Sequence, residues 1–135
     1  MSTLVDRPFE NYTIAVDFDG VLHSYASGWC GADNCPDRPI EGAIKWLNQM
    51  VKDFDVVIFT TRGDQPGANQ AIACWLRRYG YNGPDLIVTS KKLPALVYID
   101  DRGWRFEGRF PTTHEVHQAI PWYKTRTSAG KGSRS

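Results

Sequence analysis

Four short apolar runs, each followed directly by polar residues, alternate along the chain with stretches of helical periodicity. Each run is rich in β-branched or aromatic residues, which predicts a buried strand. Between the runs, apolar residues recur every three or four positions in 41–52 and in 68–79, which predicts two amphipathic helices. Strands that alternate with helices imply right-handed crossovers. The predicted fold is therefore α/β, with helices on both faces of a mostly parallel sheet in three layers. The predicted strands are 13–16, 54–59, 86–88 and 96–99.

Candidate capping residues mark the ends of the helices. Asp64 is a candidate N-cap for the second helix, and Gly80 is placed to end it. Either Thr112 or Thr113 can cap a last short helix that reaches Ile120.

Three further segments complete the chain. Residues 22–38 are rich in Ser, Gly, Asn, Asp and Pro, which predicts a loop over the end of the first strand. Residues 104–110 are a candidate for a small extra strand. The Thr, Ser, Gly, Lys and Arg residues of 124–135 are typical of a disordered tail. We therefore expect one domain over 1–123, followed by a basic tail.

Composition narrows the class of protein. The chain has 135 residues, of which 41% are hydrophobic, and no apolar run approaches the roughly 20 residues of a membrane span. The first residues lack the pattern of a secretion signal, which predicts a cytoplasmic protein without a membrane partner. Three cysteines are an odd number, which disfavours a disulfide framework. His23, Cys30 and Cys35 lack the second Cys/His pair typical of a zinc site.

The predicted strands all end in residues that can do chemistry. In a parallel sheet these ends lie along one edge, where open α/β folds bind their ligands. Asp17 and Asp19 are two residues apart at the end of the first strand, so both side chains project from the same face, and Gly20 permits a sharp turn. The other strands end in Thr60 and Thr61, in Lys91 and Lys92, and in Asp100 and Asp101.

This set of residues favours phosphoryl transfer. Several carboxylates at one edge repel one another unless a hard cation such as Mg²⁺ compensates their charge. A lysine and a hydroxyl suit the oxygens of a phosphoryl group, while one carboxylate acts as nucleophile and another as general acid and base. The expected reaction proceeds through an aspartyl-phosphate.

In this order, the motifs resemble those of the haloacid dehalogenase superfamily of phosphohydrolases. The resemblance covers most of the chain from Thr13 to Gly108 and implies a Rossmann-like sheet and a Mg²⁺-dependent phosphatase. The matching motifs are Asp-Phe-Asp-Gly-Val at 17–21, Thr60 after Val-Val-Ile-Phe, Lys92 before Leu-Pro, and Asp100 and Asp101 after Val-Tyr-Ile.

The resemblance also implies a role for each residue. Asp17 is the nucleophile, and Asp19 protonates the leaving group and later activates water. Thr60 and Lys92 grip the phosphoryl group, with Lys91 as the alternative to Lys92. For the metal, the resemblance implies these ligands or supporting residues: the Asp17 carboxylate, the Asp19 backbone carbonyl, Asp100 and Asp101.

The loop 22–38 takes the place where many relatives insert a cap domain, so the chain resembles capless members. The run 92–102 resembles small phage and bacterial members and, more loosely, the phosphatase half of polynucleotide kinase-phosphatases. An open edge suits a nucleic-acid 3′-phosphate end or a nucleotide. Candidate substrate contacts are Gly20, Tyr25, Thr61 and Arg62.

Three of these candidates, and the nearby Trp29, also have a structural alternative. Tyr25 and Trp29 can stack on a base, or they can pack the loop onto the core. Arg62 can meet a flanking phosphate, or it can pair with the carboxylates. Thr61 departs from the Ser-Gly-Arg motif of the polynucleotide enzymes and can instead cap the turn before Asp64.

Other functions remain open at this point. The loop 22–38 or a neighbouring subunit can close the site over a small sugar or nucleotide phosphate. A receiver-like phospho-acceptor is disfavoured by the order of the residues. Receiver folds have an acidic pair before the acceptor Asp and a lysine last, whereas in this chain an acidic pair follows the lysine. Nucleic-acid binding through the tail is also disfavoured, because four basic residues without interleaved aromatics bind weakly. The sequence does not predict an oligomeric state.

Overall fold

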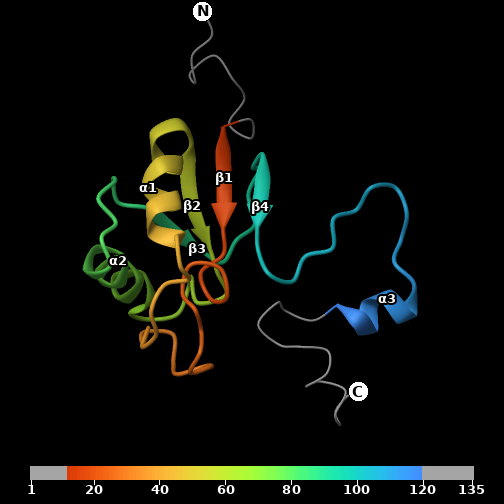
Figure 1. The fold of residues 1–135 in the computed structure, drawn as a ribbon, viewed down its shortest axis with the longest axis horizontal. Helices are drawn as coiled ribbons and strands as arrows, with labels where there is room; N and C mark the ends of the chain where they lie inside the picture. Colours follow the sequence, from red (N-terminus) through yellow and green to blue (C-terminus); the bar gives the residue numbers. More distant parts are fainter. Residues whose placement is uncertain (1–11, 120–135) are drawn as a thin grey trace, which may run out of the picture. The chain divides into compact units, whose positions relative to one another are not determined.

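The computed structural model describes residues 12–119 of the chain. The chain divides into two compact units, Met1–Ile99 and Asp100–Ser135, and each is described by itself. Residues 12–99 of the first unit hold a four-stranded sheet and two helices, and residues 100–119 of the second hold one short helix (Figure 1). Across 12–119, no helix has the length and apolar content needed to cross a membrane. The predicted tail 124–135 lies outside the described residues.

The first unit is built on a parallel sheet, as predicted. Its strands are β1 (Thr13–Val16), β2 (Asp55–Phe59), β3 (Ile87–Thr89) and β4 (Val97–Ile99), in the order β3-β2-β1-β4. Every neighbouring pair is parallel. Val16 pairs with Ile58 of β2 and with Ile99 of β4. The end of β1 therefore lies between the ends of two other strands.

Two helices connect the strands near the predicted positions. Helix α1 (Ala43–Asp53) joins β1 to β2, and α2 (Ala68–Arg78) joins β2 to β3. The prediction of Asp64 as N-cap is wrong. Gly67 occupies that position with a left-handed φ of 78°, and no side chain caps the helix, because a further turn separates Asp64 from α2. Gly80, with a φ of 101°, follows the end of α2 as predicted.

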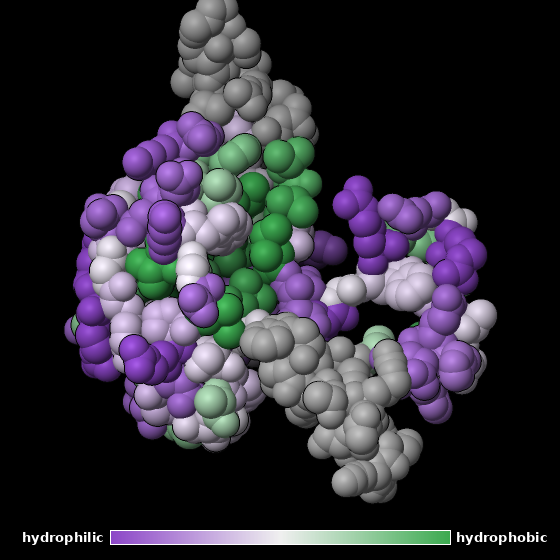
Figure 2. Space-filling view, in the orientation of Figure 1, coloured by the Kyte–Doolittle hydropathy of each residue, from purple (hydrophilic) through white to green (hydrophobic). Residues whose placement is uncertain are grey.

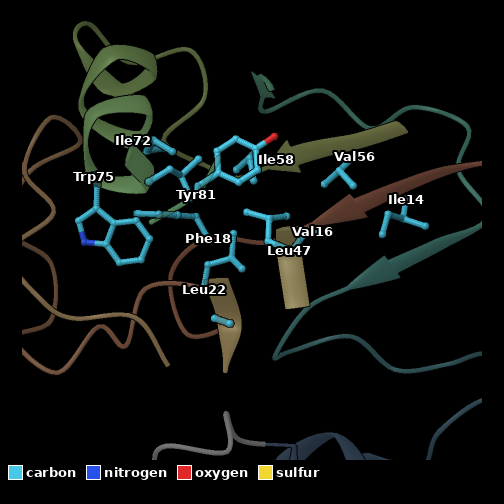
Figure 3. Close-up of a cluster of buried hydrophobic side chains, with 12 residues drawn as sticks. Ile14, Val16, Phe18, Leu22, Leu47, Val56, Ile58, Ile72, Trp75 and Tyr81 are labelled. Carbon is cyan, nitrogen blue, oxygen red and sulfur yellow. The ribbon is translucent and has the colours of Figure 1, made fainter. Parts of the chain in front are cut away.

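The core lies between the two helices and one face of the sheet (Figure 3). Side chains alternate along a strand, so Ile14 and Val16 of β1 project to the same face. This face packs against α1 through Leu47 and against α2 through Ile72 and Trp75. All five side chains are almost fully buried. The helical periodicity of the sequence is thus explained by burial on a single face.

The expected second layer of helices is not found in residues 12–99. The steps from β1 to β2 and from β2 to β3 run in one direction across the sheet, so right-handed crossovers put both helices on the same face. The return from β3 to β4 passes through 90–96, which is not helical. On the other face, the rings of Phe59 and Tyr98 meet edge to face with centroids 5.1 Å apart. The amide of Leu93 donates to the hydroxyl of Tyr98 at 2.8 Å, which ties this segment to β4.

In the second unit, α3 (Thr113–Gln118) begins with a capping box. The Thr112 hydroxyl accepts from the amide of Glu115 at 3.1 Å, and the carboxylate of Glu115 accepts from the amide of Thr112 at 2.8 Å. The prediction of a threonine cap is therefore confirmed at Thr112. Arg109 donates to both carboxylate oxygens of Glu115 at 3.0 Å, which lowers the pKa of this carboxyl to about 2.

The prediction of a small strand over 104–110 is wrong. Apolar and charged residues alternate in this segment, but Gly108 has a left-handed φ of 97°, which interrupts an extended chain. The rings of Phe106 and Phe110 pack together with centroids 4.9 Å apart, so the chain bends. A strand also needs a partner for its backbone groups, and the described residues pair no strand with this segment.

Candidate active site

In the first unit, backbone hydrogen bonds link the carboxyl ends of β1 and β4 and those of β2 and β3. The amide of Asp17 donates to the carbonyl of Ile99 at 2.9 Å, which links β1 to β4. The amide of Thr60 donates to the carbonyl of Thr89 at 2.9 Å, which links β2 to β3. The polar residues after these strands therefore share one edge of the sheet, as predicted.

Asp17 stands at the end of β1 with its carboxylate oriented by the backbone. Its Oδ1 accepts a hydrogen bond from the amide of Phe18 at 2.7 Å. The chain then turns at Gly20, whose φ of 84° is left-handed and whose amide donates to the carbonyl of His23 at 2.8 Å. A side chain at Gly20 would strain this turn, so the predicted sharp bend is confirmed.

Three N–H groups donate to the carboxylate of Asp19. Arg62 donates from Nε to Oδ2 at 2.8 Å and from Nη2 to Oδ1 at 2.9 Å. His23 Nδ1 lies 2.9 Å from Oδ1. The other ring nitrogen, Nε2, accepts from the amide of Asp37 at 3.1 Å, so the proton of a neutral imidazole is on Nδ1 and points at Asp19. The carboxylate is thus fixed from two sides.

Arg62 is completely buried and joins Asp19 to the loop 22–38. Its Nη1 donates to three backbone carbonyls of the loop, at 2.9 to 3.0 Å. All three nitrogens of the guanidinium therefore bond to protein groups, which matches the ion-pair alternative for this residue. The three carbonyls are those of Gly31, Ala32 and Asn34.

The partners of Asp19 control its ionisation. Burial by itself raises the pKa of this carboxyl, but the hydrogen bonds from His23 and Arg62, together with the charge of Arg62, outweigh burial and lower the pKa. Burial conversely lowers the pKa of Arg62, whereas the hydrogen bond and charge of Asp19 raise it, and the net direction is upward. Both groups are therefore charged at neutral pH.

The lowered pKa predicts how stability depends on pH. A carboxyl with a depressed pKa stabilises the fold above its ordinary value of 3.8, and this contribution is lost as the pH falls through the lower value of the folded protein. We expect the free energy of unfolding to decrease with falling pH below about 3.8 and to decrease less in Asp19→Asn. Urea titrations from pH 5 to pH 2 measure this slope, with Asp85→Asn at an exposed ion pair as control. Equal slopes in the wild type and Asp19→Asn would contradict the prediction.

The hydroxyl and lysine candidates come from β2 and β3. Thr60 is buried, and its hydroxyl accepts from the amide of Arg62 at 3.3 Å, whereas Thr61 is exposed. Gly63 packs against the next loop so closely that a Cβ would lie 2.4 Å from the backbone of Thr89 and Ser90. This contact needs glycine and holds the two strand ends together.

Lys92 lies in the segment between β3 and β4. Its Nζ is 5.4 Å from the centroid of the Tyr98 ring, over its face, and Tyr98 belongs to the strand next to β1. Lys91 is also exposed, and its amide donates to the hydroxyl of Thr89 at 3.0 Å. Both lysines thus remain candidates for the phosphate.

The loop 22–38 has a defined conformation without helix or strand, as predicted. The amide and hydroxyl of Ser27 donate to the carboxylate of Asp37 at 2.8 and 2.6 Å. The indole of Trp75 in α2 donates to the carbonyl of Asp37 at 2.8 Å. Tyr25 has a left-handed φ of 62°, which is unusual and strained for a bulky residue. The loop is therefore anchored both to the site and to the core.

An open groove of about 280 Å³ borders the site on the side of α1. Figure 2 shows hydrophobic residues gathered beside α1, over β1 and β4. The groove begins at Val21, next to the Gly20 turn, and includes Ile99, whose carbonyl receives the amide of Asp17. The other lining residues are Leu22, Ile40, Glu41, Gly42, Ala43 and Trp46.

The metal ligands predicted from the sequence fall in both units. Asp17 and Asp19 belong to the first unit, whereas Asp100 and Asp101 are the first residues of the second. Oδ1 of Asp100 accepts from the amides of Arg102 and Gly103 at 3.0 and 2.6 Å. In residues 12–119, no three His, Cys, Asp or Glu side chains lie together as a metal-binding group.

Oxygen donors at the end of β1 nevertheless suit Mg²⁺ chemically. This ion is usually bound by only one or two carboxylates together with water and substrate phosphates. The Asp17 carboxylate and the Asp19 backbone carbonyl are hard oxygen donors of this kind. Because the Asp19 carboxylate is held by Arg62 and His23, the predicted role of its backbone oxygen, rather than of its side chain, is compatible with the geometry.

His23 is the residue of the site that sequence reasoning missed. The sequence indicates no role for it, because His23, Cys30 and Cys35 lack the pattern of a zinc site, whereas in the structure His23 is fully buried against Asp19. Its ring stacks on Phe18 with centroids 5.1 Å apart. The only sequence signal is its place four residues after Asp19, in a turn beginning at Gly20.

Comparison of the chain with protein-family models, with curated proteins and with solved structures found no match. Membership of the haloacid dehalogenase superfamily therefore stays a prediction from the motifs.

Proposed function

We propose that the chain is a Mg²⁺-dependent phosphohydrolase of the haloacid dehalogenase type, acting through an aspartyl-phosphate on Asp17. The observation that carries this proposal is the position of Asp17 directly after the central strand β1, which pairs with β2, the strand that ends just before the buried Thr60. An oriented carboxylate is suited to attack phosphorus, and a hydroxyl that follows the neighbouring strand is suited to hold a phosphoryl oxygen.

The chain's own residues divide the reaction between them. An oxygen of Asp17 attacks phosphorus, and the bond to the leaving oxygen breaks. Thr60 and Lys92 stabilise the charge on the phosphoryl oxygens. The lowered pKa keeps Asp19 ionised at neutral pH, as a residue that accepts a proton from the water that releases phosphate must be, and it also makes Asp19 a weaker base. Its other predicted role, protonation of the leaving group, requires it first to gain a proton.

Mg²⁺, held by Asp17 and the Asp19 carbonyl with Asp100 and Asp101 as further predicted ligands, would neutralise phosphate charge. We expect phosphate release to stop in EDTA and to return with Mg²⁺. Asp100→Ala and Asp101→Ala should raise the Mg²⁺ concentration needed for half-maximal rescue. Colorimetric phosphate detection measures the rescue, with Asp33→Ala in the exposed loop as the matched control. Undiminished turnover in chelated protein would refute the role of the metal.

The substrate class has two candidates. Residues 12–99 contain no cap domain, which favours a nucleic-acid 3′-phosphate end or a nucleotide, and the anchored loop can also border a small sugar phosphate. A screen of phosphorylated oligonucleotides, nucleotides and sugars with Mg²⁺ separates these candidates. If oligonucleotide ends are preferred, their advantage in kcat/KM over mononucleotides should decrease as the salt concentration rises.

A further inference from the structure

Trp29 is an exposed aromatic residue held at the edge of the site. Its side chain is 57% exposed, although the guanidinium of Arg62 lies over one face of its ring, 5.0 Å from the centroid. Because Arg62 covers one face, the exposed surface of the ring lies on its other face and along its edges. The same guanidinium bonds to the carboxylate of Asp19, so a single group separates this ring from the predicted acid and base.

The surface beneath the ring is held in place by bonds within the protein. Arg62 is fully buried and bonded on both sides, which holds the surface beneath the indole in place. Two hydrogen bonds between Ser27 and Asp37 restrain the loop just before Trp29. A ligand that stacks on the ring thus meets an ordered surface and loses less free energy to ordering the protein.

We infer that the open face of Trp29 is a subsite for the nucleobase of a phosphorylated substrate. This inference rests on the proposed function, since it is the phosphoryl site that places the rest of the substrate nearby. Stacking suits any base because every base has a π-face, so the subsite selects nucleotides over sugar phosphates and not one base over another. It names a nucleotide as the substrate class and Trp29 as the residue that determines it.

A matched pair of ligands isolates the base. Adenosine 5′-monophosphate and ribose 5-phosphate differ only in the adenine, and both can be titrated with Mg²⁺ into the full-length Asp17→Asn variant by calorimetry. We expect the nucleotide to bind about 5- to 150-fold more tightly, as one stacked base predicts. Trp29→Ala should bring the ratio close to one, and Trp29→Phe should restore much of it.

Trp104 provides the control for a general effect of losing an exposed indole. It is 45% exposed and lies over the guanidinium of Arg109, 5.6 Å away, in the second unit. Trp104→Ala should leave the ratio unchanged. An unchanged ratio in Trp29→Ala, or an equal loss in Trp104→Ala, would overturn the subsite.

The two proposals fail in different ways. Hydrolysis of ribose 5-phosphate without a preference for the nucleotide supports the phosphohydrolase and overturns the subsite. A Trp29-dependent preference in binding without hydrolysis of any phosphorylated compound supports the subsite and overturns the phosphohydrolase. Thermal unfolding of each variant shows that it is folded before its binding is compared.

Discussion

Asp17→Asn is expected to reduce the turnover of any phosphorylated substrate by about 10³-fold or more while the protein remains folded. The amide has nearly the shape of the carboxylate, and its oxygen can still accept from the amide of Phe18 as in the wild type. It is a poor nucleophile toward phosphorus, so the covalent intermediate cannot form. Initial rates of phosphate release, with circular dichroism to verify the fold, measure the effect.

Asp85→Asn is the matched control for this experiment. Asp85 carries a 95% exposed side chain paired only at the surface with Arg77, so its replacement should leave turnover within about twofold. If the phosphorylated intermediate of the wild-type protein is trapped in acid, the phosphoryl group should be found on Asp17. Substantial activity in folded Asp17→Asn protein, or a phosphoryl group on another residue, would rule out the proposed nucleophile.

Arg62→Ala is expected to lower the free energy of unfolding by about 3–5 kcal/mol. The change leaves the carboxylate of Asp19 without its bidentate partner and removes three hydrogen bonds to loop carbonyls. It also empties a fully buried volume next to Phe18. Urea denaturation at pH 7 measures the loss.

Arg77→Ala is the corresponding surface control. Arg77 also forms an ion pair and lies over an aromatic ring, that of Tyr81, but its side chain is 44% exposed. We expect its loss to cost no more than about 1 kcal/mol. Similar costs for Arg62→Ala and Arg77→Ala would show that the buried network does not stabilise the loop. Arg62→Lys should recover little of the free energy of unfolding that Arg62→Ala loses, because an ammonium group cannot make the bidentate contact with Asp19.

The sequence predicted the elements that have a periodic pattern of apolar residues. The periodicity around Leu47 and Ile72 located both helices, because each buries one stripe of side chains against the sheet. The parallel sheet followed from the alternation of strands and helices. The prediction of a second helical layer was wrong. The face on which a helix lies depends on the order of the strands in the sheet, and the sequence pattern does not give this order. In addition, the connection from β3 to β4 through 90–96 contains no helix.

The site was predictable to a different extent. Asp17, Asp19 and Thr60 were located because they follow apolar strands, whereas the burial of His23 and Arg62 was not predicted. Polar residues in an aperiodic loop carry no sign of which will be buried, since burial depends on the partners that the fold brings to them. Arg62 shows this most clearly, because its partners lie 28 to 43 positions earlier in the chain.

The contacts of Arg62 with the loop also bear on how this protein can diverge or be redesigned. Its guanidinium binds the loop through main-chain carbonyls, which every amino acid possesses, so the anchor does not depend on the side chains of Asp33 and Asn34. Asp33 and Asn34 in this stretch are exposed. A library randomised at these two positions should therefore retain the wild-type loop path while presenting different chemistry on the loop that carries Trp29. The loop thereby separates anchorage from variation, as a scaffold for altered selectivity requires.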